Sequence, residues 1–542
     1  MDSTASCFIA YVAIALAFFQ APSSIEGFVR LGNTNEPLRG AAVTLERLGI
    51  VGGGPNLGSG ISIDSDANGR FVFKDVAPGN YRLRVAKNGY VTSYYGAVSF
   101  FDTGTVLQLV PGQAKKDIVL QLTPSGTLNG VVSDLDDNPI PNTTVQVLRT
   151  AFTEFGEPTL QSVGVARTDD RGSFRIYSLP PGSYYVLVGG QPSESGSRLI
   201  PVQSGDVPWT FYPNGQDWRF ANLVAVASGT ESTVRMRVRR QTLVSVAGRL
   251  LDSSTQEIVR NARLSLARQG IPFRGLGGNI VTQNEAGFRF VNVEPGEYRL
   301  TAFLGSGPGS SPIFSGNVTV NDENLESLVF TATEPVSVKG HLRIEGVGKP
   351  MDLGIQLVPS ANGVIGTEAP RPYIAHIDKE GRFTVESVLP GDYRVRVLTF
   401  DAGYYAKSIN AGGSDVITKT LHVENAGPDL EVVLSSRVAQ INGVVQDQQQ
   451  QPVAGAMIVL IPQVGRDRFD LYRQVSANAD GRFAFSSVAP GRYTMFALSG
   501  LERDSYFDPA FVESLAGQGT LVRAGESTTA TVALTLISRI SR

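Results

Sequence analysis

The chain has 542 residues, of which 42% are hydrophobic and 18% are charged, and its formal net charge is −3. At roughly 100 to 150 residues per domain, this length predicts about four or five compact units, and the apolar content excludes a largely disordered chain. The near balance of charges argues against binding to nucleic acid or to an anionic membrane surface, because both need clustered Lys and Arg.

The first 22 residues are expected to form an export signal or an N-terminal anchor. An apolar run from Phe8 to Phe19 precedes Ala21, a small residue that suits a cleavage site. The run is shorter than the roughly 20 residues that span a bilayer, and Asp2 stands where a signal usually carries positive charge. We expect the remainder to be extracytoplasmic (periplasm, cell surface or secreted), with the apolar segment contacting the membrane if it is retained. Cys7 is the only cysteine, which excludes internal disulfides.

Five copies of a Pro-Gly-x-Tyr pattern divide the rest of the chain. Their tyrosines lie 95 to 114 residues apart, and a phenylalanine precedes each proline by seven positions. An aliphatic residue also stands two positions before each proline. Such regular spacing indicates an internal repeat. The tyrosines are Tyr81, Tyr184, Tyr298, Tyr393 and Tyr493, and the phenylalanines are Phe71, Phe174, Phe288, Phe383 and Phe483.

Turn signals surround these landmarks in every copy. An Asp or Asn three residues before a glycine is typical of a hairpin turn in which the Asx side chain bonds the backbone and the glycine has positive φ. In the third copy Gly287 directly precedes Phe288, so we expect a different turn there. Pro-Gly predicts the centre of a type II turn, followed by a strand. The Asx and Gly pairs are Asp66 and Gly69, Asp169 and Gly172, Asn284 and Gly287, Asp378 and Gly381, and Asn478 and Gly481.

A glycine-centred strand opens each copy and an alternating strand closes it. Ile118, Leu120 and Leu122 in the first closing strand alternate with polar residues, which indicates one buried and one solvated face. No stretch has helical periodicity with caps, so we predict an all-β chain of five tandem β-sandwich modules in an elongated array. The opening glycines are Gly27, Gly130, Gly248, Gly340 and Gly443, and the predicted modules are 23–124, 125–241, 242–335, 336–437 and 438–542.

These landmarks together resemble the carboxypeptidase regulatory-like domain family. The shared pattern is D/N-x-x-G-x-F, an aliphatic residue and P-G-x-Y, with an opening strand such as Leu128-Asn129-Gly130-Val131-Val132. The resemblance covers nearly the whole chain beyond residue 23 and implies a transthyretin-like (prealbumin-like) sandwich of seven or so strands, akin to the starch-binding-like fold. Multi-copy exported versions resemble bacterial surface proteins. The matching residues are turn and core residues, so they are specific for fold and not for function.

One segment of the first copy matches the ligand spacing of an EF-hand-like calcium loop. The candidate calcium ligands are Asp64, Asp66, Asn68 and, at position 12, Asp75. The favoured alternative is the hairpin turn, because an Asx residue and a glycine recur at the positions of Asp66 and Gly69 in every copy whereas Asp64 does not recur. The flanking residues alternate as strands, not as helices. No other cofactor is expected.

The second copy contains both tryptophans of the chain in a short aromatic segment. Trp209, Phe211, Tyr212, Trp218 and Phe220 are candidates for an exposed platform that stacks on sugar rings. The alternative is that they cover the core of their own module or a joint between modules. We favour this alternative because large aromatic side chains are mostly buried.

No arrangement of residues predicts an enzyme. The three histidines, His341, His376 and His422, lie in the fourth copy, and none has Glu three positions later, as a zinc carboxypeptidase needs. A metal site formed by their convergence is the less favoured interpretation. There is no G-x-S-x-G motif, and the glycine-rich stretch at 52–60 lacks the Lys-Ser/Thr of a phosphate loop.

The expected function is that of a non-catalytic exported scaffold or adhesion protein. Repeated frameworks with variable loops predict binding of a glycan or protein ligand at the cell surface through those loops. The first alternative is a carbohydrate-binding protein that uses the aromatic residues of the second copy. The second is an accessory or regulatory partner of a hydrolase. We expect a monomer that does not bind nucleic acid.

Overall fold

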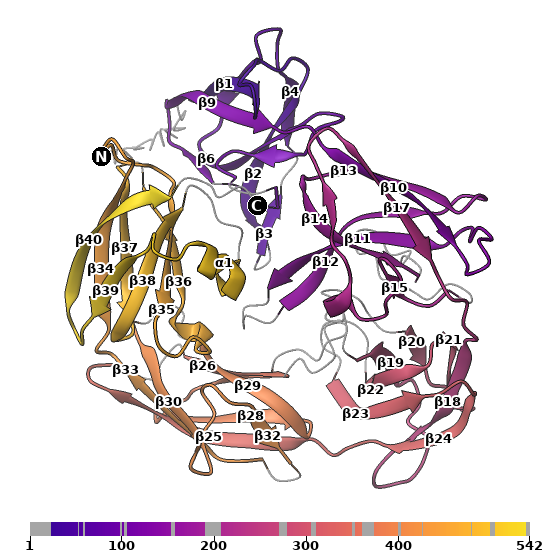
Figure 1. The fold of residues 1–542 in the computed structure, drawn as a ribbon. Helices are drawn as coiled ribbons and strands as arrows, with labels where there is room; N and C mark the ends of the chain where they lie inside the picture. The colour runs from indigo at the N-terminus through magenta and orange to yellow at the C-terminus, as the bar shows by residue number, and fades with distance from the viewer. Residues whose placement is uncertain are drawn as a thin grey trace, which may run out of the picture. The chain divides into compact units, whose positions relative to one another are not determined.

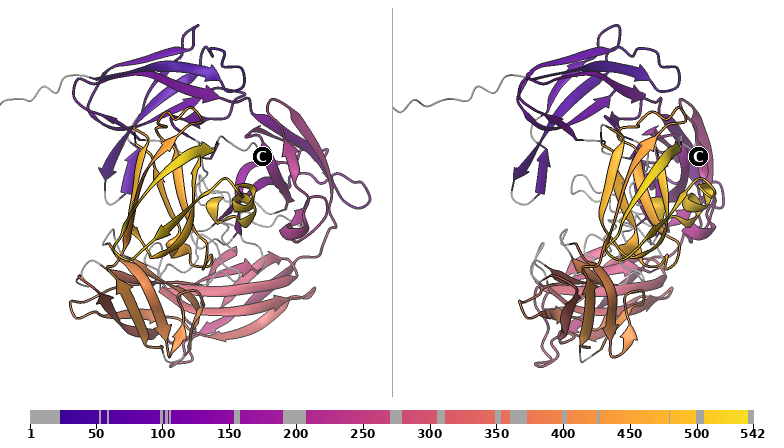
Figure 2. Two further views of the ribbon diagram at one scale, coloured as in Figure 1. Left: turned by 60° about the vertical axis from the view of Figure 1, so that its left-hand side comes forward. Right: turned by 90° about the vertical axis from the view of Figure 1, so that its left-hand side faces the viewer.

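The computed structural model describes residues 23–51, 54–57, 60–97, 100–101, 104, 106–152, 158–189, 207–269, 279–304, 311–348, 353–359, 373–398, 403–424, 427–478, 480–498 and 505–537. These residues form strands with a few short helical turns, so the chain is all-β as predicted (Figures 1 and 2). Within these ranges no helix is long and apolar enough to cross a membrane. The predicted signal or anchor segment lies outside the described residues.

The chain divides into two compact units, Met1–Pro124 and Ser125–Arg542, and the first holds one β-sandwich, module 1. Its first sheet places one strand between an antiparallel and a parallel neighbour, and its second sheet packs against the other side of the core. The first sheet has the order β5 (Arg70–Val76), β1 (Ser23–Leu31), β9 (Ala114–Leu122). The second is built on β2 (Ala42–Val51) and β6 (Gly79–Ala86), with β3 (Gly54–Leu57), β4 (Ile61–Asp64), β7 (Ser93–Tyr94) and β8 (Leu107–Leu109).

The second unit repeats this plan in tandem sandwiches, and modules 2 and 3 keep the two separate sheets. Module 2 has β13 (Ser173–Leu179), β10 (Gly126–Ser133) and β17 (Glu231–Arg237) in one sheet. Its other sheet holds β12 (Pro158–Arg167), β11 (Thr144–Phe152), β14 (Gly182–Val188), β15 (Thr210–Phe211) and β16 (Val224–Val226), and η1 (Trp218–Phe220) follows β15. Module 3 has β21 (Phe288–Val293), β18 (Val244–Leu251) and β24 (Leu325–Thr331), then β20 (Asn279–Thr282), β19 (Arg263–Arg268), β22 (Gly296–Leu304) and β23 (Ser311–Val320).

Modules 4 and 5 depart from this plan. In module 4 the first sheet gains strands, and in module 5 the two sheets join through β40. Module 4 has β28 (Arg382–Val388), β25 (Val336–Glu345), β33 (Leu430–Ser435), β30 (Tyr405–Ala411) and β31 (Ser414–Asp415), then β27 (Tyr373–His376), β26 (Gly354–Pro359), β29 (Gly391–Leu398) and β32 (Leu421–Val423). Module 5 has β36 (Arg473–Ser476), β35 (Met457–Pro462), β38 (Gly491–Leu498), β40 (Thr529–Ile537), β34 (Ala439–Gln446), β37 (Arg482–Val488) and β39 (Thr520–Ala524), with η2 (Phe469–Leu471), η3 (Ser505–Phe507) and α1 (Pro509–Ser514).

The opening glycine and the repeated phenylalanine form one packing unit. A Cβ on Gly443 would lie 2.4 Å from the Val532 backbone oxygen and 2.4 Å from the Phe483 ring. The same close approach to the parallel closing strand occurs at the other four opening glycines. Glycine is therefore required here by space, because the phenylalanine ring and the neighbouring backbone occupy the volume of any larger side chain.

The repeated tyrosine closes the turn that precedes its strand. Tyr393 Oη donates a hydrogen bond of 2.6 Å to the Leu389 carbonyl, four residues earlier and just before the Pro-Gly pair. Tyr81, Tyr184 and Tyr493 make the equivalent bond in their modules. The predicted type II turn is wrong in all five copies, because this turn needs a glycine with φ of roughly +80°. The Pro-Gly glycine has φ of 154° or 155° in three copies, and Gly182 and Gly491 do not have positive φ. These glycines begin the strand and leave room for the folded-back tyrosine ring.

The predicted Asx turns are present. Asp66 Oδ1 accepts hydrogen bonds of 2.8 Å from the Asn68 and Arg70 backbone N–H groups, and Gly69 has φ of 72°. The copies that begin at Asp169, Asp378 and Asn478 repeat this geometry. In the third copy the Asn284 side chain accepts from the Ala286 backbone N–H, and Asn284 and Gly287 exchange two backbone hydrogen bonds, so the turn differs there as predicted.

The hydrophobic clusters of the described residues support separate modules in tandem. Modules 1, 3, 4 and 5 each contain a cluster built from the inward residues of their own strands, and module 5 contains a second, smaller cluster. The repeated phenylalanines, tyrosines and aliphatic residues are all buried. The landmarks of the sequence therefore report the framework of each sandwich. The exact module boundaries and the elongated array stay predictions.

Candidate binding site

The aromatic segment of module 2 packs on the outer face of that module's second sheet. Phe211 on β15 is fully buried and forms a small second core with three leucines of β11, β12 and β14. Trp209 and Trp218 cover this core, and the Trp218 ring meets Tyr185 edge-on at 5.9 Å. Because Phe211 is buried, its ring cannot belong to an exposed platform.

Trp209 lies at a joint between modules 2 and 3. Its backbone N–H donates a 2.8 Å hydrogen bond to the carboxylate of Glu294, which is buried in module 3. Glu294 also forms a 2.5 Å ion pair with Arg268. A buried carboxylate needs such partners, so this contact fixes the segment to the next module. Tyr212 and Trp218 are half-buried and Phe220 is 83% exposed.

The predicted calcium residues are not brought together. Asp66 and Asn68 are part of the Asx turn, and Asp64 is an exposed end of β4. Asp75 has φ of 55° at the bulge where β5 shifts register against β1. Ser178, Asn292 and Ser387 occupy the same left-handed position in modules 2 to 4, so the bulge explains a small polar residue there.

The histidines of module 4 also stay apart. His341 Nε2 lies 3.0 Å from the Glu380 carbonyl oxygen, and His422 Nδ1 lies 2.7 Å from Asp392 Oδ1. Across the described ranges, no three His, Cys, Asp or Glu side chains gather as a metal site would need. The geometry therefore supports neither the calcium loop nor convergence of His341, His376 and His422.

A cleft of about 530 Å³ lies between modules 4 and 5. Four consecutive residues of β29, Arg394 to Val397, line one wall. The same wall continues with Tyr404, Tyr405 and further residues of β30. The opposite wall is formed by η2, β36 and β37 of module 5. This volume falls in the range of small-molecule and peptide sites.

The cleft exists because β30 belongs to the first sheet of module 4 and does not pair with β29 in the second sheet. In modules 1, 2, 3 and 5, strands pair with both the beginning and the later part of the strand that follows Pro-Gly. In module 4, β32 pairs only with Gly391–Tyr393, and β30 pairs with β33 of the first sheet (Figure 1). Among the described residues, no strand pairs with this edge of β29 beyond Tyr393. The sandwich is therefore open between β29 and β30.

Arg468 holds module 5 against β30 at the end of the cleft. Its guanidinium donates a 2.8 Å hydrogen bond to the Ala406 carbonyl and two bonds of 2.7 Å to the Asp470 carboxylate. Burial lowers the pKa of Arg468, but the hydrogen bonds and charge of Asp470 outweigh burial and keep that pKa above its ordinary value. The residue is therefore a permanent cation that joins the two modules.

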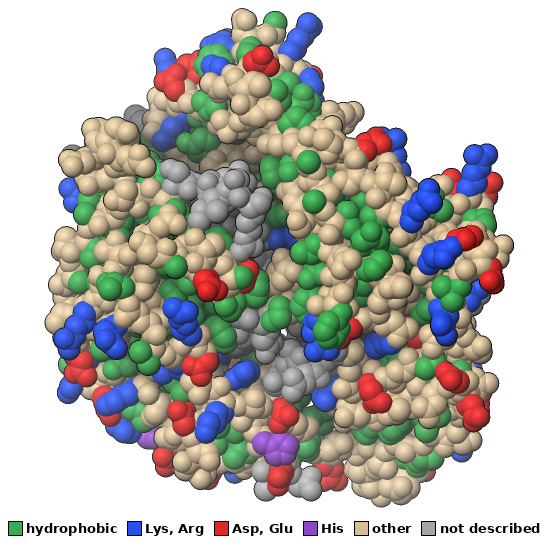
Figure 3. Space-filling model, viewed as in Figure 1, with side chains coloured by type: hydrophobic (Ala, Val, Ile, Leu, Met, Phe, Trp, Pro, Cys, Tyr) green, Lys and Arg blue, Asp and Glu red, His purple; other side chains and the backbone are tan. Residues whose placement is uncertain are grey.

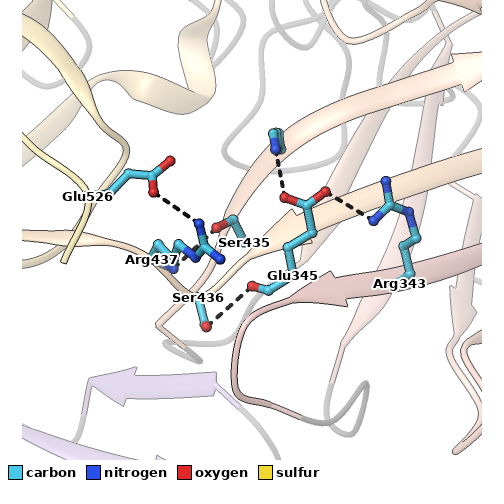
Figure 4. A network of polar contacts seen from close by, with 7 residues as sticks. Arg343, Glu345, Ser435, Ser436, Arg437 and Glu526 are labelled. Atoms are coloured by element: carbon cyan, nitrogen blue, oxygen red, sulfur yellow. Dashed lines mark hydrogen bonds and ion pairs between the residues drawn. The ribbon is translucent and has the colours of Figure 1, made fainter.

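The linker between modules 4 and 5 is also tied down (Figure 4). The Ser436 backbone N–H donates to the Glu345 carbonyl at 3.0 Å, and Arg437 reaches Glu526 of module 5 at 3.2 Å. The Glu345 carboxylate accepts from Lys407 of β30 at 2.6 Å, and this bond, with that from Arg343, holds the Glu345 pKa below its ordinary value. These contacts connect the linker to the strand that changed sheets.

The charge of the cleft is positive. Arg394 is half-buried and donates to the Thr418 carbonyl, Arg396 is exposed on β29, and Arg473 lies on the opposite wall. Of the lining carboxylates, Asp470 is already paired with Arg468, which leaves Asp467. Elsewhere on the face seen in Figure 3, cationic and anionic side chains are interspersed. The cleft can therefore attract an anionic ligand.

A sequence model of the carboxypeptidase regulatory-like domain matches residues 24–122, 127–209 and 440–535, more than half of the chain. The chain belongs to this family. The matched ranges fall in modules 1, 2 and 5, and the structure repeats the same opening strand, turn and tyrosine in modules 3 and 4. The resemblance seen in the sequence is therefore confirmed.

A curated relative shares part of the chain. A probable alpha-galactosidase A of Aspergillus terreus is 30% identical over 154 residues, which are 28% of this chain and 26% of the relative. The chain thus spans about a quarter of the length of that enzyme.

Three bacterial proteins are among the solved structures that match this chain. The Bacillus anthracis TIE protein matches at 12% identity over 73% of this chain and 68% of its own, with a TM-score of 0.16. A streptococcal ancillary pilin matches at 12% identity over 58% and 99%, with a TM-score of 0.21. The minor pilin GBS52 of Streptococcus agalactiae matches at 13% identity over 40% and 96%, with a TM-score of 0.22. These scores are too low to support an inference about this chain.

The repeated residues of this carboxypeptidase regulatory-like chain do not predict the cleft, although one position of the sequence indicates it. Val433 of β33 is 7% exposed, whereas the corresponding residues of the other closing strands are exposed and polar. An apolar residue at this position indicates a covered closing strand. The corresponding residues are Gln121, Arg237, Thr331 and Thr535.

Proposed function

We propose that this protein is a non-catalytic, exported binding scaffold. Its repeated residues serve the framework, and its ligands are recognised by surfaces that differ between modules. The carrying observation is that the recurring Gly, Phe, Asx and Tyr residues each have a turn or packing role. Surfaces outside this framework, such as the module 4–5 cleft, are where modules differ and where binding specificity can reside.

The location at the cell surface or in the periplasm is part of the same proposal. It is supported by the apolar N-terminal run, which has the pattern of an export signal. The expected ligand is a glycan or a protein. The partial similarity to a galactosidase covers too little of that enzyme to favour catalysis.

The test is binding without turnover by the full chain. Purified protein is applied to a glycan array and to immobilised surface proteins, and is incubated with peptide and glycoside substrates. We expect saturable binding and no hydrolysis above the buffer blank. Hydrolysis that follows the protein through successive purification steps and disappears in a point variant would contradict the scaffold.

A second candidate is carbohydrate binding by module 2. The support is the ring of Phe220, which is 83% exposed and lies on η1 beside the half-buried Trp218. Phe220→Ala and Tyr212→Ala should reduce retention on polysaccharide columns without changing the melting temperature. Leu223→Ala, at another exposed apolar residue nearby, is the matched control. Unchanged retention in both aromatic variants would remove this candidate.

A further inference from the structure

The module 4–5 cleft runs along strand edges and not along a sheet face. In a strand, successive side chains point to opposite faces, so a cleft over a face touches alternate residues. Here the lining residues are consecutive, Arg394–Val397 on β29 and Ala484–Val488 on β37. Arg473–Val475 of β36 also line it. Both β36 and β37 are terminal strands of their sheet.

The edge of β29 offers main-chain hydrogen-bonding groups. A strand with a neighbour on one side only presents unpaired N–H and C=O groups on the other, and such an edge accepts an added strand. Residues 394–398 pair with β26, and no described strand pairs with their opposite edge. At about 3.3 Å per residue, the open edge accommodates about four residues of an extended chain.

The charges that line the cleft determine which kind of peptide segment it can bind. Arg394 lies on β29 itself, and Arg473 lies on β36 across the cleft. Asp470 is engaged by Arg468, so Asp467 is the remaining lining carboxylate. Half-buried Tyr404 and Tyr405 and the ring of Phe469 supply apolar surface between the cations. An added strand that alternates acidic and apolar side chains complements this lining.

We infer that the cleft binds an extended acidic segment of a partner protein by strand addition to β29. The inference rests on the proposed binding role and specifies its site and the chemistry of its partner. The segment adds as a short strand beside Arg394–Val397, its carboxylates meet the arginines, and its apolar side chains meet Tyr404, Tyr405 and Phe469. Module 1 has arginines at the same strand positions, Arg82 and Arg84, but there the edge is paired with β7 and β8. Module 1 is therefore a built-in control.

The probe is a fluorescein-labelled peptide of about six residues with alternating valine and glutamate, titrated with the full chain. We expect saturable binding by anisotropy that weakens at high salt. Arg394→Glu and Arg473→Glu should each weaken binding about tenfold or more, as reversal of one charge-assisted contact implies. Arg84→Glu in module 1 should bind as the unchanged protein does. Melting curves check that each variant is folded.

A peptide with N-methyl groups at alternate positions separates strand addition from simple charge attraction. It keeps the carboxylates but loses main-chain donors along one edge, so we expect its binding to be lost when the methylated edge faces β29. Equal binding by peptides methylated on either edge would overturn strand addition. Unchanged binding in both arginine variants would place the peptide elsewhere and overturn the site.

A sulfated oligosaccharide is the competing occupant. If it binds, if its binding is lost in Arg473→Glu, and if the peptide does not bind, the cleft is an anionic glycan site and the peptide inference fails. Failure of the peptide leaves the scaffold proposal standing, because that proposal is tested on the glycan array and on substrates. Hydrolysis by the purified chain would overturn the scaffold and leave peptide binding to be judged by its own titration.

Discussion

Modules 3 and 4 share a framework and then diverge after the same tyrosine. In module 3, β23 follows β22 along its whole length, from Gly296 to Leu304. In module 4, the equivalent strand β30 pairs with β33 of the opposite sheet. One module is therefore closed beside its central strand and the other is open. The repeated residues therefore determine the opening strand, the turn and the hairpin. They do not determine which sheet the following strand joins.

The largest expected loss of stability comes from replacing the opening glycines of modules 3 and 4, and it tests whether the two modules share the framework. Gly248→Val and Gly340→Val each put side-chain atoms where the closing-strand oxygen lies 2.3 Å or 2.5 Å from a Cβ. We expect each to destabilise its own module by at least about 3 kcal/mol. Hydrogen exchange of strands in modules 3 and 4 measures the loss module by module. Gly215→Ala, where no atom lies nearer than 4.0 Å, is the control.

The next effect is confined to module 3. Glu294 stands before the Pro-Gly pair, where module 4 has Leu389, and it is paired with Arg268 in a buried setting. Glu294→Ala leaves Arg268 without its carboxylate and should cost about 3 kcal/mol. Protection should fall in module 3 and around Trp209, and not in module 4. Glu285→Ala breaks an exposed pair with Arg260 and should cost no more than about 0.5 kcal/mol.

A smaller loss of stability should be equal in modules 4 and 5. Tyr393→Phe and Tyr493→Phe each remove one hydrogen bond to the carbonyl before Pro-Gly. Loss of one such bond should cost about 1 kcal/mol in each case. Unfolding followed by hydrogen exchange reports both. A cost near zero in module 4 alone would mean that its open edge has relaxed this turn.

The smallest effect concerns the short paired part of β29. Asp392 there accepts from His422 of β32, and this hydrogen bond raises the His422 pKa above 6.5. The charged form is favoured in the folded protein, so the stabilisation is present below pH 6.5 and is lost as pH rises through the raised pKa. Asp392→Asn should return the His422 pKa toward 6.5 in an NMR titration. Glu424→Gln, at 3.7 Å from Nε2, should change it less.

Much of the framework could be predicted because its residues are bound by local geometry. Gly69, which has positive φ, and Asp66, which accepts two backbone hydrogen bonds, lie within one turn. The number of residues between them therefore determines how they lie in the structure. Phe383 over Gly340 is a longer contact, yet it recurs in register with the turn. The recurrence of this phenylalanine and glycine in every copy marks them as framework residues, which one copy alone would not do.

The candidate site could not be predicted in the same way. The cleft depends on which sheet β30 joins, and this is a competition between two edges that lie far apart in the sequence. Arg468 and Ala406 meet only after modules 4 and 5 have packed. The short helix α1 and the joint at Glu294 also depend on single-copy residues that no repeat marks. The sequence allows a joint between modules as one interpretation of Trp209, but it does not identify Glu294 as the partner.

In every module the first and last strands of the first sheet lie side by side and run parallel, as β1 and β9 do. The chain therefore enters a module at one end of this pair and leaves it at the opposite end. Tension applied through the chain pulls the two strands past each other, so their ladder of hydrogen bonds is loaded in shear and must give way together. A protein fixed at one end and pulled at the other would meet that resistance in each module in turn.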